Sequence, residues 1–202
     1  MSRRSASVAS AIALCFLVCA PLSASAQTNV WRTLGDGDGL VILYRHALAP
    51  GGGDPADFDV DDCSTQRNLS DDGRRQARDM GRQLRVRGVD VSRVLSSPWC
   101  RSRETADLMD VGRVRELTRL GSVFTAPTSV AQRREAATRR LIERHADRSG
   151  VMILVGHQAN IIDLTGVAPT SGEGVVVRHN EQEPGALEIL GTVPAPDIRG
   201  GP

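Results

Sequence analysis

Aromatic residues are scarce in this 202-residue chain, which has 3 Phe, 2 Trp and 1 Tyr. Its hydrophobic core must therefore depend on Val, Leu, Ile and Ala. The chain also lacks a charge of one sign, because charged residues make up 24% of the sequence but the formal net charge is only +1. Such a balance provides no basic field that would favour nucleic acid as a partner.

The length and the lack of internal repeats favour a single domain. A chain of 202 residues is long enough for one real core and too short for two ordinary domains with linkers. A glycine run at 51–53 lies in a long polar loop, but the Gly-Lys-Ser/Thr of a nucleotide-binding P-loop is missing. We predict one domain over 27–193, preceded by a leader at 1–26 and followed by a disordered Pro/Gly-rich tail at 194–202.

The leader at 1–26 has the pattern of a secretory signal peptide. Arg3 and Arg4 give a positive start, a largely apolar segment follows, and the small residues at 24–26 fit a signal peptidase site. A membrane anchor is the alternative, but the apolar segment is shorter than the ~20 residues that a span needs. We therefore predict cleavage after Ala26 and a periplasmic or secreted mature protein that is not bound to a membrane.

Only two cysteines remain in the predicted mature chain. Cys15 and Cys19 lie within the leader, whereas Cys63 and Cys100 follow it. Two cysteines in an oxidising compartment predict one disulfide bond, and both flank segments that we assign to one site below. Two unrelated buried thiols are the alternative.

Segments typical of strands and helices alternate along the chain. Strands are predicted at 40–44, 91–96 and 151–155, with a weaker one at 111–117 and two edge strands at 175–177 and 186–190. Helices are predicted at 29–35, 70–86, 98–109, 129–146 and 157–164. This alternation, with unbroken apolar strands, indicates an α/β fold in which helices cover both faces of a mainly parallel central sheet, as in a three-layer sandwich.

Cationic and imidazole side chains follow three of these predicted strands. Arg45 and His46 follow the first strand, Arg101 follows the second, and His157 follows the apolar strand at 151–155. Ligands of such sheets bind at the carboxyl ends of the strands, and parallel neighbours bring those ends together. Two arginines and two histidines at one place favour a phosphate dianion, because guanidinium groups bind phosphate oxygens in a bidentate way.

A histidine in such a cluster is a candidate nucleophile. Neutral imidazole can attack phosphorus and form a covalent phosphohistidine, which water then hydrolyses. The second imidazole, if protonated, would stabilise charge on the equatorial oxygens. The predicted partner is therefore a small phosphorylated substrate.

Four segments resemble motifs of the histidine phosphatase superfamily, whose fold is phosphoglycerate mutase-like. They occur in the family's order at 44–47, 69–77, 96–106 and 155–157, and read YRHA, LSDDGRRQA, SSPWCRSRETA and VGH. The resemblance implies that His46 is the phosphorylated nucleophile and that Arg45, Arg101 and His157 hold the phosphoryl group. It implies a phosphatase for a phosphomonoester or phosphoramidate that uses no metal ion or other cofactor. Ala47 departs from the family's usual glycine.

The general acid is the second departure from the family pattern. Members with such an acid carry Glu or Asp after the second arginine, where it protonates the leaving oxygen. Glu116 is the best-placed candidate, and a surface ion pair with a nearby arginine is its alternative role. Asp54, Asp57 and Asp163 are poorer candidates.

Two other functions stay open at this stage. One is a non-catalytic phosphate-binding protein of the same fold, which lacks a working acid. The other is a metal-dependent hydrolase built on the two histidines and the acidic run at 57–62.

Overall fold

The computed structural model describes residues 30–35, 37–183 and 185–198. The predicted signal peptide and the last four residues of the predicted tail lie outside this part of the chain. Residues 194–198 form neither helix nor strand. Within the described ranges, no helix combines the length and the apolar character of a membrane span.

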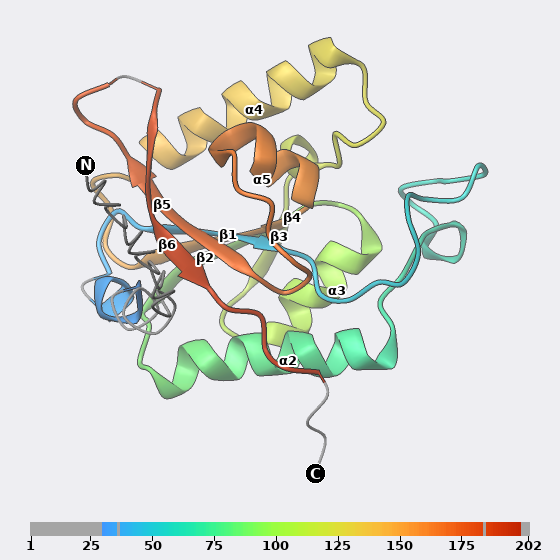
Figure 1. Ribbon diagram of the computed structural model, residues 1–202, viewed down its shortest axis with the longest axis horizontal. Coiled ribbons are helices and arrows are strands. Elements are labelled where there is room, and N and C mark those ends of the chain that lie inside the picture. The colour runs from blue at the N-terminus through green and yellow to red at the C-terminus, as the bar shows by residue number, and fades with distance from the viewer. Residues whose placement is uncertain (1–29, 36, 184, 199–202) are drawn as a thin grey trace, which may run out of the picture.

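A six-stranded sheet with the order β3-β2-β4-β1-β5-β6 forms the centre of the molecule (Figure 1). The strands are β1 (Val41–Arg45), β2 (Val91–Ser96), β3 (Val114–Glu116), β4 (Val151–Gly156), β5 (Gly174–His179) and β6 (Leu187–Val193). The first four of these strands in chain order run parallel, and β5 and β6 are antiparallel. The predicted α/β fold with a mainly parallel sheet is confirmed.

One prediction about the sheet is wrong, because β5 is not an edge strand. It pairs with β1 on one side and with β6 on the other, so only β6 lies at that edge. The run Val175 to Val177 is fully buried, as an interior strand requires. Its local pattern shows burial, but the order of strands depends on contacts distant in sequence.

Helices cover both faces of the sheet (Figure 1). They are α2 (Asp71–Val86) and α3 (Cys100–Met109) on one face, and α4 (Thr128–Glu143) and α5 (Gln158–Thr165) on the other. Residues 30–35 are also helical. Short 3-10 turns occur at Cys63–Thr65 and Thr118–Leu120.

Each face of the sheet has its own core, because successive strand side chains point to opposite faces. In β1, Ile42 and Tyr44 pack in the core that contains residues of α2 and α3. Val41 and Leu43 pack in the second core, which contains residues of α4 and α5. The continuous apolar sequence of β1 is therefore buried on both sides, and the strand is held rigidly up to its polar end.

Helix starts agree with the sequence in one case and differ in another. The Ser70 hydroxyl accepts a hydrogen bond from the Gly73 N–H at 3.0 Å and caps α2, as its sequence predicts. The helix predicted at 129–146 begins at Thr128 instead, directly after Pro127, and no side chain among the described residues caps it. Proline has a fixed φ that is compatible with a helix start, and here it opens the helix one residue earlier.

Candidate active site

The carboxyl ends of β1, β4 and β2 lie level with one another. Arg45 pairs with Gly156 across β1 and β4, and the His46 N–H donates to the Gly156 carbonyl at 2.9 Å. The Ser97 N–H donates to the Val155 carbonyl at 2.9 Å, which aligns β2 with β4. The residues that follow these three strands therefore meet at one place.

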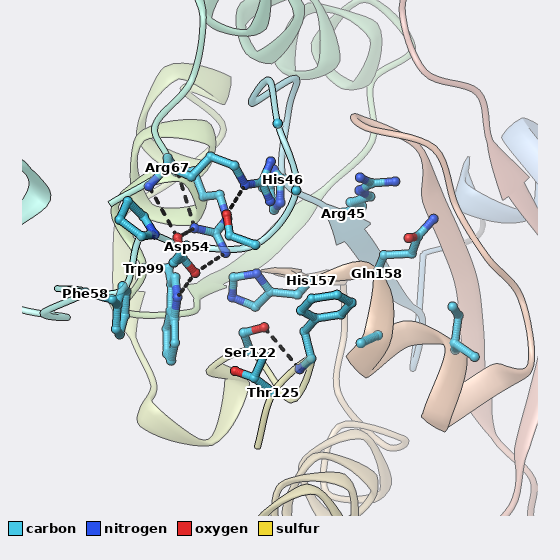
Figure 2. A pocket seen from close by; sticks show the side chains of 18 residues that line it. Arg45, His46, Asp54, Phe58, Arg67, Trp99, Ser122, Thr125, His157 and Gln158 are labelled. Atoms are coloured by element: carbon cyan, nitrogen blue, oxygen red, sulfur yellow. Dashed lines mark hydrogen bonds and ion pairs between the residues drawn. The ribbon is translucent and has the colours of Figure 1, made fainter. Parts of the chain in front are cut away.

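A pocket of about 440 Å³ opens at this place (Figure 2). Arg45, His46, Arg101 and His157 all line it. The two imidazole rings are 5.7 Å apart between centroids and nearly perpendicular. The structure thus brings together four predicted site residues from three separate parts of the sequence.

His46 is held as a neutral imidazole with one nitrogen free. Its Nδ1 lies 2.7 Å from the Ala47 carbonyl oxygen. A carbonyl can only accept, so Nδ1 carries the proton and Nε2 keeps its lone pair. Burial, together with the charges of nearby arginines, lowers the pKa of His46 to about 3 even though the Ala47 carbonyl opposes the shift. This is the protonation state that a histidine nucleophile needs.

Ala47, where the family usually has glycine, fits its position. It has no positive φ, so its backbone does not need the freedom of glycine. Its N–H donates to Thr105 Oγ1 at 3.0 Å, and the residue is fully buried. The alanine therefore helps to fix the backbone next to His46.

His157 is oriented by residues at the end of β2. Its Nε2 lies 2.8 Å from the Ser97 hydroxyl, and its ring lies edge-on to Trp99 with centroids 5.3 Å apart. Burial, and then the nearby His46, lower the pKa of His157 well below its ordinary value. It is therefore neutral, and it offers a single N–H rather than the full charge considered from the sequence.

Arg101 uses only part of its guanidinium group for contacts within the protein. Nη1 and Nη2 donate to the two carboxylate oxygens of Asp54 at 2.5 and 3.1 Å, and Nη1 also donates to the Arg67 carbonyl at 3.3 Å. Among the described residues, the buried Nε–H of Arg101 has no acceptor. The edge formed by Nε and Nη2 can therefore accept a bidentate oxyanion.

Arg45 presents a second buried donor of the same kind. Its Nη1 donates to the Pro169 carbonyl at 3.1 Å, whereas its Nε–H is buried without an acceptor in the described part of the chain. A buried N–H without a partner costs about 1–3 kcal/mol. Both arginines line the pocket, so an anion bound there would complete their hydrogen bonding.

Asp54 is the partner of Arg101, a role that the sequence did not reveal. Its carboxylate also accepts hydrogen bonds from Trp99 Nε1 at 3.1 Å and from the Arg67 N–H at 3.3 Å (Figure 2). Burial raises the pKa of Asp54, but the hydrogen bonds and charge of Arg101 outweigh it and lower the pKa overall. Asp54 is therefore an ionised acceptor, which makes it a poor proton donor.

Arg67 is a third pocket arginine, and it has no motif in the sequence that marks it. Its Nε donates to the Gly53 carbonyl at 2.9 Å, and its Nη1 donates to the Ala49 carbonyl. These contacts fold the loop at 47–69 back on itself and place Asp54 in front of Arg101. Its position is set by loop contacts, which no periodic pattern predicts.

Glu116 does not reach the pocket. It lies at the end of the edge strand β3 and pairs with Arg103 Nη1 at 3.2 Å, with 48% of its side chain exposed. In the sheet order, β2 and β4 separate β3 from β1, so this carboxylate is on the outer side of the site. Its alternative role, a surface ion pair, is the one that the structure displays.

Asp54 is the one carboxylate among the described residues that line the pocket. The aspartates of the run at 57–62 are exposed on the loop. Within the described ranges, no group of three or more His, Cys, Asp and Glu side chains is placed to hold a metal ion. The donor set required by the metal-dependent alternative is not assembled around the two histidines.

A disulfide joins the loop to the start of α3. The sulfur atoms of Cys63 and Cys100 are 1.93 Å apart, and their Cα atoms are 5.7 Å apart. Next to it, Gln66 Oε1 accepts from the Cys100 N–H at 2.9 Å, and Gln66 Nε2 donates to the Asp59 carbonyl at 2.9 Å. Since Arg101 follows Cys100 directly, the loop is fastened beside a residue of the pocket.

The comparisons with known proteins agree with this architecture. The family model of the histidine phosphatase superfamily (branch 1) matches residues 41–120. The fold is similar to that of the protein histidine phosphatase SixA in complex with tungstate, with a TM-score of 0.53 and 20% identity over 74% of this chain and 93% of that chain. No curated protein sequence matches this chain.

Two further solved structures share the fold. A mycobacterial glucosyl-3-phosphoglycerate phosphatase with inorganic phosphate has a TM-score of 0.55 and 16% identity, over 80% of this chain and 99% of that chain. A mutant phosphoserine phosphatase from Entamoeba histolytica in complex with phosphoserine has a TM-score of 0.50 and 13% identity, over 74% of this chain and 94% of that chain. The class is therefore a phosphoglycerate mutase-like α/β protein with histidines and arginines at its strand ends. Residues 41–120 are thus similar to the histidine phosphatase superfamily, and the fold is the one that these solved phosphatases share.

Proposed function

We propose that this protein is a metal-independent phosphatase that hydrolyses a phosphomonoester or phosphoramidate through a phosphohistidine at His46. The observation that carries this proposal is the pairing, in one pocket, of a neutral His46 with buried arginine N–H groups that have no acceptor among the described residues. A tetrahedral oxyanion would satisfy these donors and would place its phosphorus atom near the imidazole. The match of residues 41–120 to the histidine phosphatase family model supports the same chemistry.

In the first step, His46 Nε2 attacks phosphorus, and the bond from phosphorus to the leaving group breaks. The leaving group departs with the electron pair of that bond. Arg45, Arg101 and His157 donate hydrogen bonds to the oxygens that gain charge in the transition state. In the second step, water attacks the phosphohistidine, which releases orthophosphate and restores the neutral His46.

The pocket lacks a carboxylic acid that is ready to protonate the leaving group, as far as the described residues go. Leaving groups that are stable without prompt protonation should therefore react fastest, which favours aryl esters and phosphoramidates over alkyl esters. One relative by fold is named a protein histidine phosphatase, and this fits the phosphoramidate option.

Hydrolysis of p-nitrophenyl phosphate by residues 27–202 in the presence of EDTA tests the proposal. We expect turnover, transfer of radiolabelled phosphate to the protein, and loss of both in His46→Ala. Val86→Ala, a change on the exposed surface of α2, is the matched control and should keep full activity. Complete loss of activity in EDTA would support the metal-dependent alternative. Phosphate binding without turnover of any aryl ester or phosphoramidate would support the non-catalytic one.

We also propose that the protein is exported and cleaved after Ala26. The pattern of the leader supports this, and so does a disulfide pair in the remaining chain. Expression of the full chain in a Gram-negative bacterium, followed by fractionation and intact mass measurement, tests it. A full-length protein in the cytosol with free thiols would contradict the proposal.

A further inference from the structure

We propose that the leaving-group side of this pocket binds a flat aromatic ring, so that the substrates are aryl phosphate monoesters. This inference rests on the proposed function, because it concerns the part of the substrate that the arginines and histidines do not hold. The inference depends on the side chains that line the pocket beyond the phosphoryl site and on the ionised form of Asp54.

Aromatic residues are concentrated at the pocket. The whole chain has only 3 Phe, 2 Trp and 1 Tyr. Phe58, Trp99 and Phe124 all line the pocket, which is half of these residues. In a chain whose core is built almost entirely from aliphatic side chains, this concentration indicates a role in binding rather than in folding.

One wall of the pocket carries apolar side chains that are exposed to solvent. Phe124, which lies in the segment after β3, is 70% exposed, and Ile162 of α5 is 39% exposed. Both residues line the pocket. An exposed phenyl ring leaves apolar area in water, and an apolar ligand that covers it gains the free energy of that burial.

The segment that carries Phe124 is fixed in place. The Val123 N–H donates to Asn160 Oδ1 at 3.2 Å, and Asn160 Nδ2 donates to the Gly121 carbonyl at 2.9 Å. These bonds attach the segment to α5, which also carries Ile162. The apolar wall is therefore held by α5 next to His157, the residue that precedes this helix.

Another part of the pocket lining is an aromatic stack. The Phe58 ring packs on Trp99 with centroids 5.2 Å apart and planes inclined by 21°. Trp99 is fixed by its hydrogen bond to Asp54 and by its edge-on contact with His157. The stack therefore adjoins His157 at the phosphoryl site, and Phe58 and Phe124 both add apolar surface to the pocket lining.

The chemistry of the leaving group agrees with these walls. The pocket volume of about 440 Å³ lies within the range of small-molecule sites and leaves room for a ring beside the phosphoryl group. Asp54 is ionised and bonded to Arg101, so it cannot readily supply a proton. Phenolic leaving groups need that proton least, because the negative charge is delocalised into the ring. Binding and reactivity therefore favour the same class of substrate.

Binding of two phosphonates that cannot be hydrolysed tests the ring site without any need for turnover. We expect phenylphosphonate to bind residues 27–202 up to about tenfold more tightly than methylphosphonate in calorimetry, because only the former places a ring against the apolar lining of the pocket. In Phe124→Ala, the affinities for the two phosphonates should become nearly equal. Val86→Ala, in which the truncated side chain is 71% exposed on α2, is the control and should keep the difference in affinity.

Hydrolysis of a matched pair of esters tests the same site in turnover. Para-chlorophenyl phosphate and hexafluoroisopropyl phosphate have leaving groups of similar acidity, but only the first has a ring. We expect kcat/KM to favour the aryl ester by up to about tenfold, with the preference lost in Phe124→Ala.

Failure of the ring site and failure of the proposed function give different results. Equal binding of the two phosphonates, together with turnover that depends on His46, would overturn the aromatic site and leave the phosphatase in place. A Phe124→Ala variant that keeps the full phenyl preference would also overturn it. If neither phosphonate binds and no ester is hydrolysed, the phosphoryl site itself is wrong, and both proposals fall.

Discussion

The pocket has two halves of different origin. The strand-end half consists of Arg45, the last residue of β1, and of His46 and His157, which directly follow β1 and β4. The loop half consists of Asp54, Phe58 and Arg67 from the loop at 47–69. Arg101, at the start of α3, joins them through its ion pair with Asp54. The sheet fixes the reacting groups, whereas the loop fixes the arginine that faces them.

Loss of the disulfide, which ties the loop half to α3, should have the largest effect on stability. Replacing Cys63 and Cys100 by Ser frees a loop with a sequence separation of 37, which should lower the free energy of unfolding by about 4 kcal/mol. For a domain of this size, Tm should fall by roughly 8 to 16 °C. Calorimetry with and without reductant measures this, and reductant should leave the Tm of the double variant unchanged. A wild-type Tm that is insensitive to reductant would show that the bond contributes nothing.

Arg101→Lys removes the guanidinium group at the junction of the two halves. Lysine cannot bind Asp54 and a phosphoryl oxygen at the same time in a bidentate way, so kcat/KM should fall about 100-fold. Arg103→Lys is the matched control two positions further along α3, where the arginine pairs with Glu116 at the surface. Steady-state kinetics with p-nitrophenyl phosphate compare the two variants, and equal effects would remove Arg101 from the site.

The buried histidines make stability depend on pH. The pKa of His46 is about 3 in the folded protein, below its ordinary value of 6.5, so the unfolded chain binds the proton more strongly. The stabilisation is fully present above pH 6.5 and is lost as the pH falls from there toward 3. Each histidine whose pKa is lowered in this way should reduce the free energy of unfolding by up to about 1.4 kcal/mol per pH unit.

Urea unfolding between neutral pH and pH 4 measures this slope. His46→Gln should have a shallower slope than the wild type, because it has one fewer group that binds a proton on unfolding. The same slope in both proteins would mean that His46 is not held neutral in the folded state.

Asp54→Asn separates positioning of Arg101 from acid catalysis. The amide keeps the shape of the side chain but not its charge. We therefore expect kcat/KM to fall about tenfold, and to a similar extent for alkyl and aryl esters. A general acid would instead slow alkyl esters much more and would change the basic limb of the pH profile. Asp54→Glu should restore part of the activity. Glu116→Gln, which removes a carboxylate outside the pocket, is the control and should change neither rate.

The strand-end half could be predicted from the sequence because its cause is local. An apolar run such as 40–44 predicts a strand, and residues after parallel strands share one edge of the sheet. Arg45, His46 and His157 lie where this reasoning placed them. Ser70 is also predictable, because capping uses groups only three residues apart.

The loop half could not be predicted, because its geometry depends on contacts without a periodic signal. Asp54 lies on a loop segment that Arg67 holds through the Gly53 and Ala49 carbonyls, and from there it pairs with Arg101. The Glu116 prediction had a similar weakness, since position along the chain does not tell how far a strand lies from the centre of the sheet.

Within the described part of the chain, buried N–H groups of Arg45 and Arg101 have no acceptor. Orthophosphate, the product of the proposed reaction, presents the same oxygens to these donors as the substrate does. A site built in this way should suffer product inhibition, and turnover should slow as phosphate accumulates. Such an enzyme would be most effective in surroundings where free phosphate is scarce and released phosphate is rapidly removed.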